Sequence, residues 1–366
     1  MVNVFLLINI KSILVAVALG ISSFIGKTMY DSGEFNNIDP HFDGQCIAVN
    51  GVYGPEDITI LSNGIALISS DHRWLTLAGA PVQGGIYSFD LNDSSHQPVN
   101  LTGDLGFEFH PHGIGVYENK NGSARLCVVN HTGTKNSIVV FDFRDGKLFY
   151  LKTITDPLLV SPNDLVMLDQ NRFYVTNDHG SATYNGKMIE DYLRLSKANV
   201  LVYDGQNFSL VADGLSYANG INMSLDGSII YVAETIARKI SVYSRNNENN
   251  TLTFKREILL GSGVDNIELD NNGSLWIGSH PKLLTFVDHA KNAGALSPSQ
   301  VLRLSMGENG SFSTQEIYLS TGEDLSGSSV AAVYDNTLLI GAVFDDHFLM
   351  CSLARSVMDT INQAGR

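Results

Sequence analysis

The sequence has few cysteines, few charged residues and no motif for zinc or serine-hydrolase chemistry. Neither His-Glu-x-x-His nor paired Cys-x-x-Cys occurs, which argues against a zinc centre, and no Gly-x-Ser-x-Gly elbow is present. Lys and Arg number 23 against 38 Asp and Glu, so the net charge of −15 argues against a nucleic-acid-binding protein, which needs a basic face. With 44% hydrophobic residues, the chain is not of the disordered class either.

Long apolar runs are also scarce, except at the N-terminus. Residues 4–25 are apolar apart from a few polar positions, and the uninterrupted part, residues 12–26, has a length between that of a signal-peptide core and a membrane span. Ala18 and Gly20 have the spacing of a cleavage site, so removal and retention both stay open. Either outcome predicts the secretory pathway, with the protein extracellular or membrane-anchored.

Acceptor sequons for N-glycosylation agree with that compartment, although the pattern is common by chance. Because Asn222 falls within an apolar strand, we expect that site to be unmodified. The nine sequons begin at Asn92, Asn100, Asn121, Asn130, Asn207, Asn222, Asn249, Asn272 and Asn309.

A repeated strand-turn-strand unit dominates the rest of the chain. Its best copy spans residues 55–68, where Asn63-Gly64 lies between two apolar runs and predicts a tight hairpin. Five degraded copies follow at intervals of roughly 50 residues, a period typical of propeller blades. One small sheet cannot bury both of its faces, so the copies must stack. The sequence therefore predicts an all-β fold, a six-bladed β-propeller.

Each copy opens with a polar dipeptide just before its first strand. In a propeller the innermost strands start beside the central axis, so these dipeptides are expected to converge there. They are Glu56-Asp57, His112-Gly113, Asn163-Asp164, Asn219-Gly220, Asp265-Asn266 and Ser328-Ser329.

Converging carboxylates and amides in a partly dry channel favour a bound hard cation. Such oxygens cannot all stay ionised without a counter-charge, and calcium accepts six to eight of them, whereas zinc prefers His or Cys. The alternative is that Asx residues before strands merely form turns. Recurrence at equivalent places in five copies favours the metal.

Two histidines belong to the second copy. His112 lies in its axial dipeptide, and His131 follows its second strand, so a hairpin would bring the two rings side by side. Such a pair can work as a general base, one ring accepting a proton while the other sets its tautomer. The alternative is a pair of satisfied core residues. His179, His280 and His347, near other strand ends, are weaker candidates.

The three cysteines have separate interpretations. Cys46 precedes the first copy and Cys351 ends the last, where a closing ring joins the ends of the chain, so we infer a disulfide between them. Cys127 lies in an apolar run and is expected to be a buried free thiol. The predicted layout is a signal or anchor segment at 1–26, a linker at 27–44 and the propeller at 45–366.

Two segments depart from the repeat. Met188, Tyr192 and Leu195 recur at helical spacing, which predicts a short amphipathic helix within residues 181–199, either a packed cap or a lid over a pocket. Residues 71–85 have no strand pattern and are expected to lie over one end of the ring. Trp74, Tyr217 and Phe286 are candidate pocket walls.

Several ordered blocks resemble the paraoxonase/arylesterase family of calcium-dependent lactonases. The likeness runs from about Asp43 to Leu353 and includes Pro55-Glu56-Asp57, His110-Pro111-His112-Gly113-Ile114, Val128-Val129-Asn130-His131, Thr176-Asn177-Asp178-His179 and Val264-Asp265-Asn266-Ile267. One departure is Gly278-Ser279-His280-Pro281, where members of the family often have a free cysteine. No thiol role can be assigned there.

The resemblance implies a propeller with two calcium ions in its tunnel. It implies a catalytic ion bound by Glu56, Asn163, Asn219, Asp265 and Asn266, and a structural ion bound by Asp57, Asp164 and the backbone carbonyl of Ile114. It also implies a catalytic dyad of His112 and His131 and a disulfide between Cys46 and Cys351. Glu56 or Asp265 stays open as an alternative base.

The implied activity is hydrolysis of small lactones and aryl esters. The N-terminal segment implies possible association with a membrane or lipid particle, and the family typically keeps this segment. One alternative is a membrane-anchored chaperone or binding propeller without turnover, and another is a gluconolactonase-type propeller with a single metal.

Overall fold

The computed structural model describes residues 10–133, 135–307 and 310–354. They form six antiparallel sheets, each with its own innermost strand. These innermost strands contact one another in the cyclic order β3, β7, β11, β15, β19, β23 and back to β3. The predicted six-bladed β-propeller is confirmed.

The first three blades are each built from four consecutive strands, as the hairpin repeat predicts. Blade one contains β3 (Pro55–Ile60), β4 (Ile65–Ser70), β5 (Gly85–Asp90) and β6 (Val99–Asn100). Blade two contains β7 (Pro111–Glu118), β8 (Ala124–Thr132), β9 (Lys135–Arg144) and β10 (Lys147–Ile154). Blade three contains β11 (Pro162–Met167), β12 (Phe173–Asn177), β13 (Ala198–Tyr203) and β14 (Phe208–Leu215).

The fourth blade is also built from consecutive strands, whereas the fifth and sixth each take a further strand from the start of the chain. Blade four contains β15 (Ala218–Met223), β16 (Ile229–Glu234), β17 (Lys239–Arg245) and β18 (Leu252–Leu259). Blade five contains β19 (Gly263–Leu269), β20 (Leu275–His280), β21 (Ser299–Met306) and β22 (Phe312–Ser320), with β1 (His41–Phe42) at its edge. Blade six contains β23 (Ser328–Tyr334), β24 (Thr337–Ala342), β25 (His347–Leu353) and β2 (Gly44–Asn50).

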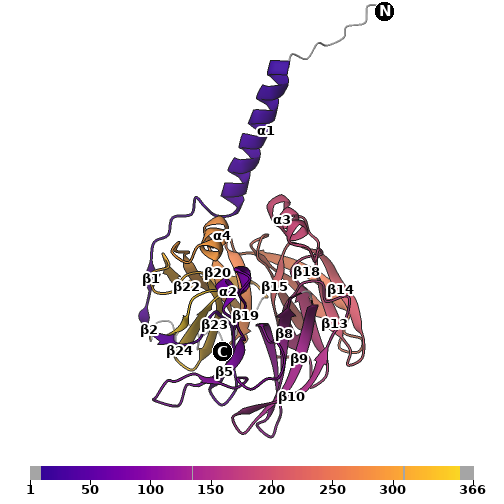
Figure 1. Cartoon of the computed structure of the whole chain (residues 1–366), viewed down its shortest axis with the longest axis vertical. Helices are drawn as coiled ribbons and strands as arrows, with labels where there is room; N and C mark the ends of the chain where they lie inside the picture. Colours follow the sequence, from indigo (N-terminus) through magenta and orange to yellow (C-terminus); the bar gives the residue numbers. More distant parts are fainter. Residues whose placement is uncertain (1–9, 134, 308–309, 355–366) are drawn as a thin grey trace, which may run out of the picture.

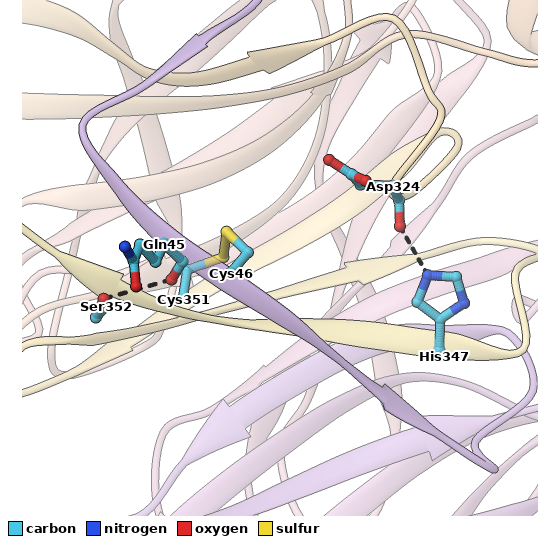
Figure 2. The surroundings of a disulfide bond; sticks show 6 residues. All are labelled: Gln45, Cys46, Asp324, His347, Cys351 and Ser352. Atoms are coloured by element: carbon cyan, nitrogen blue, oxygen red, sulfur yellow. Dashed lines mark hydrogen bonds between the residues drawn. A yellow bond between two sulfur atoms is a disulfide. The ribbon is translucent and has the colours of Figure 1, made fainter.

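A disulfide joins the two ends of the ring. β2 pairs antiparallel with β25, Cys46 lies directly opposite Cys351, and the two sulfur atoms are bonded (Figure 2). The inferred bridge is confirmed, and it closes a loop whose ends are 305 residues apart. Cys127 is a buried free thiol, as predicted, and burial raises its pKa to about 12.

The core lies between the blades. Six apolar clusters of described residues each join two neighbouring blades. In the cluster between blades one and two, for example, Leu67 and Ile86 pack with Ile114 and Leu126. Each blade is therefore covered on both sides by its neighbours, and their contacts stabilise the ring.

Every innermost strand has an irregularity at its polar dipeptide. The register of β3, β7, β11, β15, β19 and β23 with its partner strand shifts there, as in the step from Pro111 to Ile114. Such bulges redirect side chains and release backbone N–H groups from the ladder. They place the dipeptides at the axis.

Glycine in two of the dipeptides lets neighbouring strands approach closely. A Cβ at Gly113 would lie 2.5 Å from the Cα of Asp164, and one at Gly220 would lie 2.7 Å from the Cα of Asn266. A larger residue would therefore push apart the strands that carry the acidic and amide groups.

Four helices are described, and residues of all four come together at one end of the ring. Figure 1 shows α1 (Ile10–Asp31) rising from the end where α3 (Tyr184–Leu193) and α4 (Leu283–Lys291) lie. Helix α3 is the helix expected within residues 181–199. The sequence pattern missed α4, and it also missed α2 (Arg73–Leu77) within the segment 71–85.

The structure separates the sequons by exposure. Asn130 is buried, accepting from the backbone N–H of His110, so a glycan there would disrupt β8. Asn222 is half-buried in β15, and Asn309 lies outside the described residues. The other six sequon asparagines are exposed.

Candidate functional site

A cavity of about 510 Å³ lies at the helix-bearing end of the propeller axis. Glu56, His112, Asn163, Asn219 and Asp265 line its base, where the innermost strands begin. Five of the six predicted polar dipeptides thus have a residue in this cavity, whereas Ser328-Ser329 does not line it.

Five buried oxygens around the base have no hydrogen-bond partner among the described residues. The residues that carry them are between 1% and 5% exposed. Leaving a buried acceptor unpaired costs about 1–3 kcal/mol, so five together indicate a missing partner. This oxygen cluster consists of Glu56 Oε2, Asn163 Oδ1, Asn219 Oδ1, Asp265 Oδ1 and Asn266 Oδ1.

The other polar atoms of the same side chains are held in place by neighbours. Asn163 donates to Asp178 Oδ2 at 3.2 Å, and Asn219 donates to Thr235 Oγ1 at 3.1 Å. Each amide therefore keeps its carbonyl oxygen free. The remaining two contacts follow the same pattern: Asn266 Nδ2 donates to Glu56 Oε1 at 2.9 Å, and His280 Nε2 lies 2.8 Å from Asp265 Oδ2.

Two further carboxylates lie in the second position of their dipeptides. Asp57 accepts from the backbone N–H of Ile114 at 2.7 Å, and Asp164 accepts from that of Ile221 at 2.8 Å. Burial raises the pKa of both well above the ordinary value, and the negative charge of Glu56 on Asp57, and of Asp57 on Asp164, raises it further. A nearby cation would relieve this repulsion.

The donor chemistry fits calcium. Among the described residues, no three His, Cys, Asp or Glu side chains come close enough to hold a metal ion by themselves. Three of the five free oxygens belong to asparagine amides instead, and mixed carboxylate and amide oxygens are typical calcium ligands. The cluster therefore suits a hard cation and not zinc.

The two histidines form a hydrogen-bonded pair. His112 Nδ1 lies 3.0 Å from His131 Nε2, and His131 Nδ1 lies 2.8 Å from Asn136 Oδ1. Asn136 donates its own N–H groups to the carbonyls of Leu159 and Val160, so its oxygen must accept. Burial, and then the charge of His112, lowers the pKa of His131 to about 4, which keeps this ring neutral at neutral pH.

This chain of bonds sets the tautomer of His112. Neutral His131 donates to Asn136 and must accept at Nε2, so His112 carries its proton on Nδ1. The free lone pair of His112 is then on Nε2, which lies 3.4 Å from Glu56 Oε1. Sequence reasoning missed Asn136, although it lies directly opposite His131 in the β8–β9 hairpin.

The weaker histidine candidates have other partners. His280 holds Asp265 and stacks on Phe286, with ring centroids 3.9 Å apart. His179 bridges Asp178 at 2.6 Å and Asp191 of α3 at 2.8 Å. Burial opposes protonation of His179, but the bonds to these two carboxylates prevail and raise its pKa to about 9.

His347 lies on β25, where its Nε2 contacts the backbone carbonyl of Asp324 (Figure 2). Tyr217 and Phe286 line the cavity, as expected of pocket walls. Trp74 is not among the described residues that line it. Its indole donates to the carbonyl of His289 and stacks on Phe344, so it fastens α2 to α4.

The end of α1 forms part of the cavity rim. Thr28, Asp31 and Ser32 line it, and the carboxylate of Asp31 pairs with Arg194 just after α3. Glu34 accepts from the backbone N–H of Leu284 at 2.8 Å, at the start of α4. Residues 27–44, predicted to be a linker, thus include the last turn of α1 and contacts that hold both rim helices.

Comparisons with known proteins place the chain in the arylesterase family. The family model described as Arylesterase matches residues 37–353. Rat serum paraoxonase/arylesterase 2 is 37% identical over 322 residues, covering 84% of this chain and 88% of that protein. Rabbit serum paraoxonase/lactonase 3 is 34% identical over 348 residues, covering 91% of this chain and 97% of that protein.

Solved structures of more distant proteins share the fold. A putative gluconolactonase superimposes with a TM-score of 0.52 at 14% identity, covering 87% of this chain and 95% of that one. Regucalcin from Agrobacterium tumefaciens, described as a calcium-binding protein, has a TM-score of 0.52 at 13% identity, covering 85% and 94%. At such identities the likeness shows the propeller alone.

Proposed function

We propose that this chain, which belongs to the arylesterase family, hydrolyses lactones and aryl esters at a calcium site on the propeller axis. The family assignment supports ester and lactone hydrolysis as the reaction class, since relatives are named arylesterase and lactonase. The single observation that carries the calcium part is the oxygen cluster, five buried acceptors that lack a hydrogen-bond partner among the described residues.

We assign Glu56, Asn163, Asn219, Asp265 and Asn266 to a catalytic calcium ion. Asp57, Asp164 and the backbone carbonyl of Ile114 are assigned to a structural ion. The chemistry that calcium supplies when bound is Lewis acidity toward a carbonyl oxygen. The protein contributes a fixed set of oxygens, because each ligand side chain is oriented by a second hydrogen bond.

In this proposal His112 removes the proton from the attacking water. Its Nε2 carries the free lone pair, as the bonds through His131 and Asn136 require. When His112 becomes an imidazolium, Nδ1 still donates to His131, and the new N–H faces the carboxylate of Glu56. Glu56 thereby stabilises the charge that His112 gains. Glu56 is a poorer base because its Oε1 already accepts from Asn266 and its Oε2 belongs to the oxygen cluster assigned to calcium.

We also propose that α1 is retained as a membrane anchor, with the propeller outside. Lys11–Asp31 is long and apolar enough to cross a membrane, with a mean hydropathy of 1.7 and none of that window buried. A signal sequence would meet the same criteria. The contacts of Asp31, Ser32 and Glu34 with the cavity rim favour retention, because cleavage after Gly20 would leave an apolar half-helix fixed there.

The decisive experiment uses the full-length protein in detergent. With calcium it should hydrolyse phenyl acetate and δ-valerolactone, and chelation should abolish both activities. Asn219→Ala should lower kcat/KM by at least about a hundredfold by removing one ligand. Asn222→Ala is the matched control on the same strand, because its amide bonds to the carbonyl of Ile267 outside the cluster.

Metal analysis completes the test. Two calcium ions per chain are expected, whereas one would favour a single-metal gluconolactonase-type site. A folded, calcium-loaded protein that turns over no ester on a broad panel would refute the hydrolase and favour a binding propeller.

A further inference from the structure

Arg73 is a cation of the cavity wall that has one acidic partner among the described residues. It starts α2, lines the cavity, and its side chain is 15% exposed. Its Nη2 lies 3.6 Å from Glu56 Oε2, and its Nη1 donates to the carbonyl of Val343 at 3.3 Å. Among the described residues no other ion pair or hydrogen bond of this guanidinium is found.

The neighbouring acidic residue and the other cations of the cavity pair with groups other than Arg73. Asp71, two residues earlier, bonds to His110 and Thr76. Of the other cavity-lining cations, Lys187 lies 4.0 Å from Asp178, and Arg194 pairs with Asp31. Neither of these two depends on a residue of the oxygen cluster for its counter-charge.

Within the described part of the chain, the acid that pairs with Arg73 is therefore one that the proposed function gives to calcium. Glu56 Oε2 is the member of the oxygen cluster that faces Arg73. Once its charge is shared with a divalent ion, the guanidinium has surplus positive charge in a partly dry wall. Such a group is costly unless an anion joins it. Arg presents a planar fork of donors that matches a carboxylate.

We propose that Arg73 is a specificity-determining residue that binds a carboxylate carried by the substrate a few bonds from the reacting carbonyl. This inference rests on the proposed function and names its substrate class: lactones or esters with a fixed acidic substituent. The distance of 3.6 Å from Arg73 to Glu56 places the acid-binding donors beside the oxygen cluster.

The test compares two lactones that share a ring. One is γ-butyrolactone with a γ-carboxylate, and the other is γ-valerolactone, with a methyl group at the same carbon. The calcium-loaded full-length enzyme should prefer the first. Arg73→Met should lower the ratio of the two kcat/KM values by roughly ten- to hundredfold, the range for a charge-assisted hydrogen bond. Arg73→Lys should lower it less, because it keeps the charge without the fork.

Lys187→Met is the matched control, since it removes another cavity cation that has its own acid. Its ratio should stay within about twofold of the wild type. Hydrolysis also produces a carboxylate, so product inhibition by 4-hydroxypentanoate is measured separately with the neutral lactone. If Arg73→Met changes only this inhibition and not the ratio, the substrate assignment is wrong.

Calcium affinity gives a readout that needs no turnover. Removing a cation beside a ligand carboxylate should tighten calcium binding severalfold in Arg73→Met, measured by competition with a fluorescent chelator. Unchanged affinity together with an unchanged ratio would overturn the role of Arg73. If the wild type hydrolyses neither lactone nor any other ester, the proposed hydrolase itself fails, which is a distinct result.

Discussion

Replacing Asp57 by asparagine should have opposite effects on stability with and without calcium. Asp57 is 2% exposed, and its carboxylate accepts from the N–H of Ile114, a bond that an amide oxygen can also accept. Without metal, the substitution removes a buried charge that burial and Glu56 disfavour. With metal, it removes a charged group from the site proposed for a structural ion.

The size of the first effect has an upper bound. A buried carboxyl can take up a proton instead of staying charged, so at pH 7 its penalty cannot exceed the cost of protonating a group with its ordinary pKa of 3.8. That cost is about 4 kcal/mol. With an unfolding entropy of about 2.1 cal/mol/K per residue over roughly 320 folded residues, it corresponds to at most about 6 °C in Tm.

The pH dependence follows from the direction of the shift. Because the pKa of Asp57 is raised in the folded state, the unfolded chain binds fewer protons above pH 3.8, and stability falls as pH rises from there toward the folded pKa. In chelator, the Tm of the wild type should fall between pH 5 and 7, and that of Asp57→Asn should fall less.

The assay is thermal unfolding in chelator and in excess calcium. Asp57→Asn should melt several degrees higher than the wild type in chelator at pH 7 and gain less from calcium. Asp270→Asn is the control: Asp270 is buried among hydrogen bonds to Ser274 and Trp276 away from the axis, so its loss should destabilise both states alike. Asp57→Asn melting at or below the wild type in chelator would refute the reasoning.

Three further predictions concern His179, the contact between α1 and α3, and the ring closure. His179 has a raised pKa of about 9, so its interactions stabilise the fold fully below pH 6.5 by roughly 3 kcal/mol. This contribution is lost as the pH rises through 9. The Tm should therefore fall between pH 7 and 9.5 in the wild type but not in His179→Gln. Asp31→Asn breaks the pair with Arg194 and should speed hydrogen exchange in α3 severalfold, while Tm changes by less than about 2 °C because partly exposed pairs contribute little. Unchanged exchange would mean that α1 does not hold α3. Cys351→Ser should lower the free energy of unfolding by roughly 5 kcal/mol. If loop closure is the cause, the wild type under reductant should have the same Tm as this variant.

Much of the fold could be predicted because it depends on short-range patterns. Asn63-Gly64 between two apolar runs is a strong local hairpin signal, and repetition of that unit favours a ring in which every sheet is buried. The convergence of the dipeptides follows from the same topology. Helix α4 escaped detection because it is short and amphipathic, without a cap signal.

The contacts that define the site could not be predicted in the same way. Asn136, Arg73 and Asp31 carry no local signal that separates them from surface polar residues. Each acquires its role from a partner brought close by the ring: His131 across a hairpin, Glu56 on another strand and Arg194 after a distant helix.

The sequence by itself determined the blade repeat, the paired cysteines and the residue types gathered on the axis, because periodicity and turn chemistry act over a few residues. The tertiary structure alone decided which oxygens stay unpartnered, which nitrogen of His112 faces the cavity and how α1 meets the rim. Those properties depend on distances between blades, set by bulges and close strand contacts that no single segment encodes.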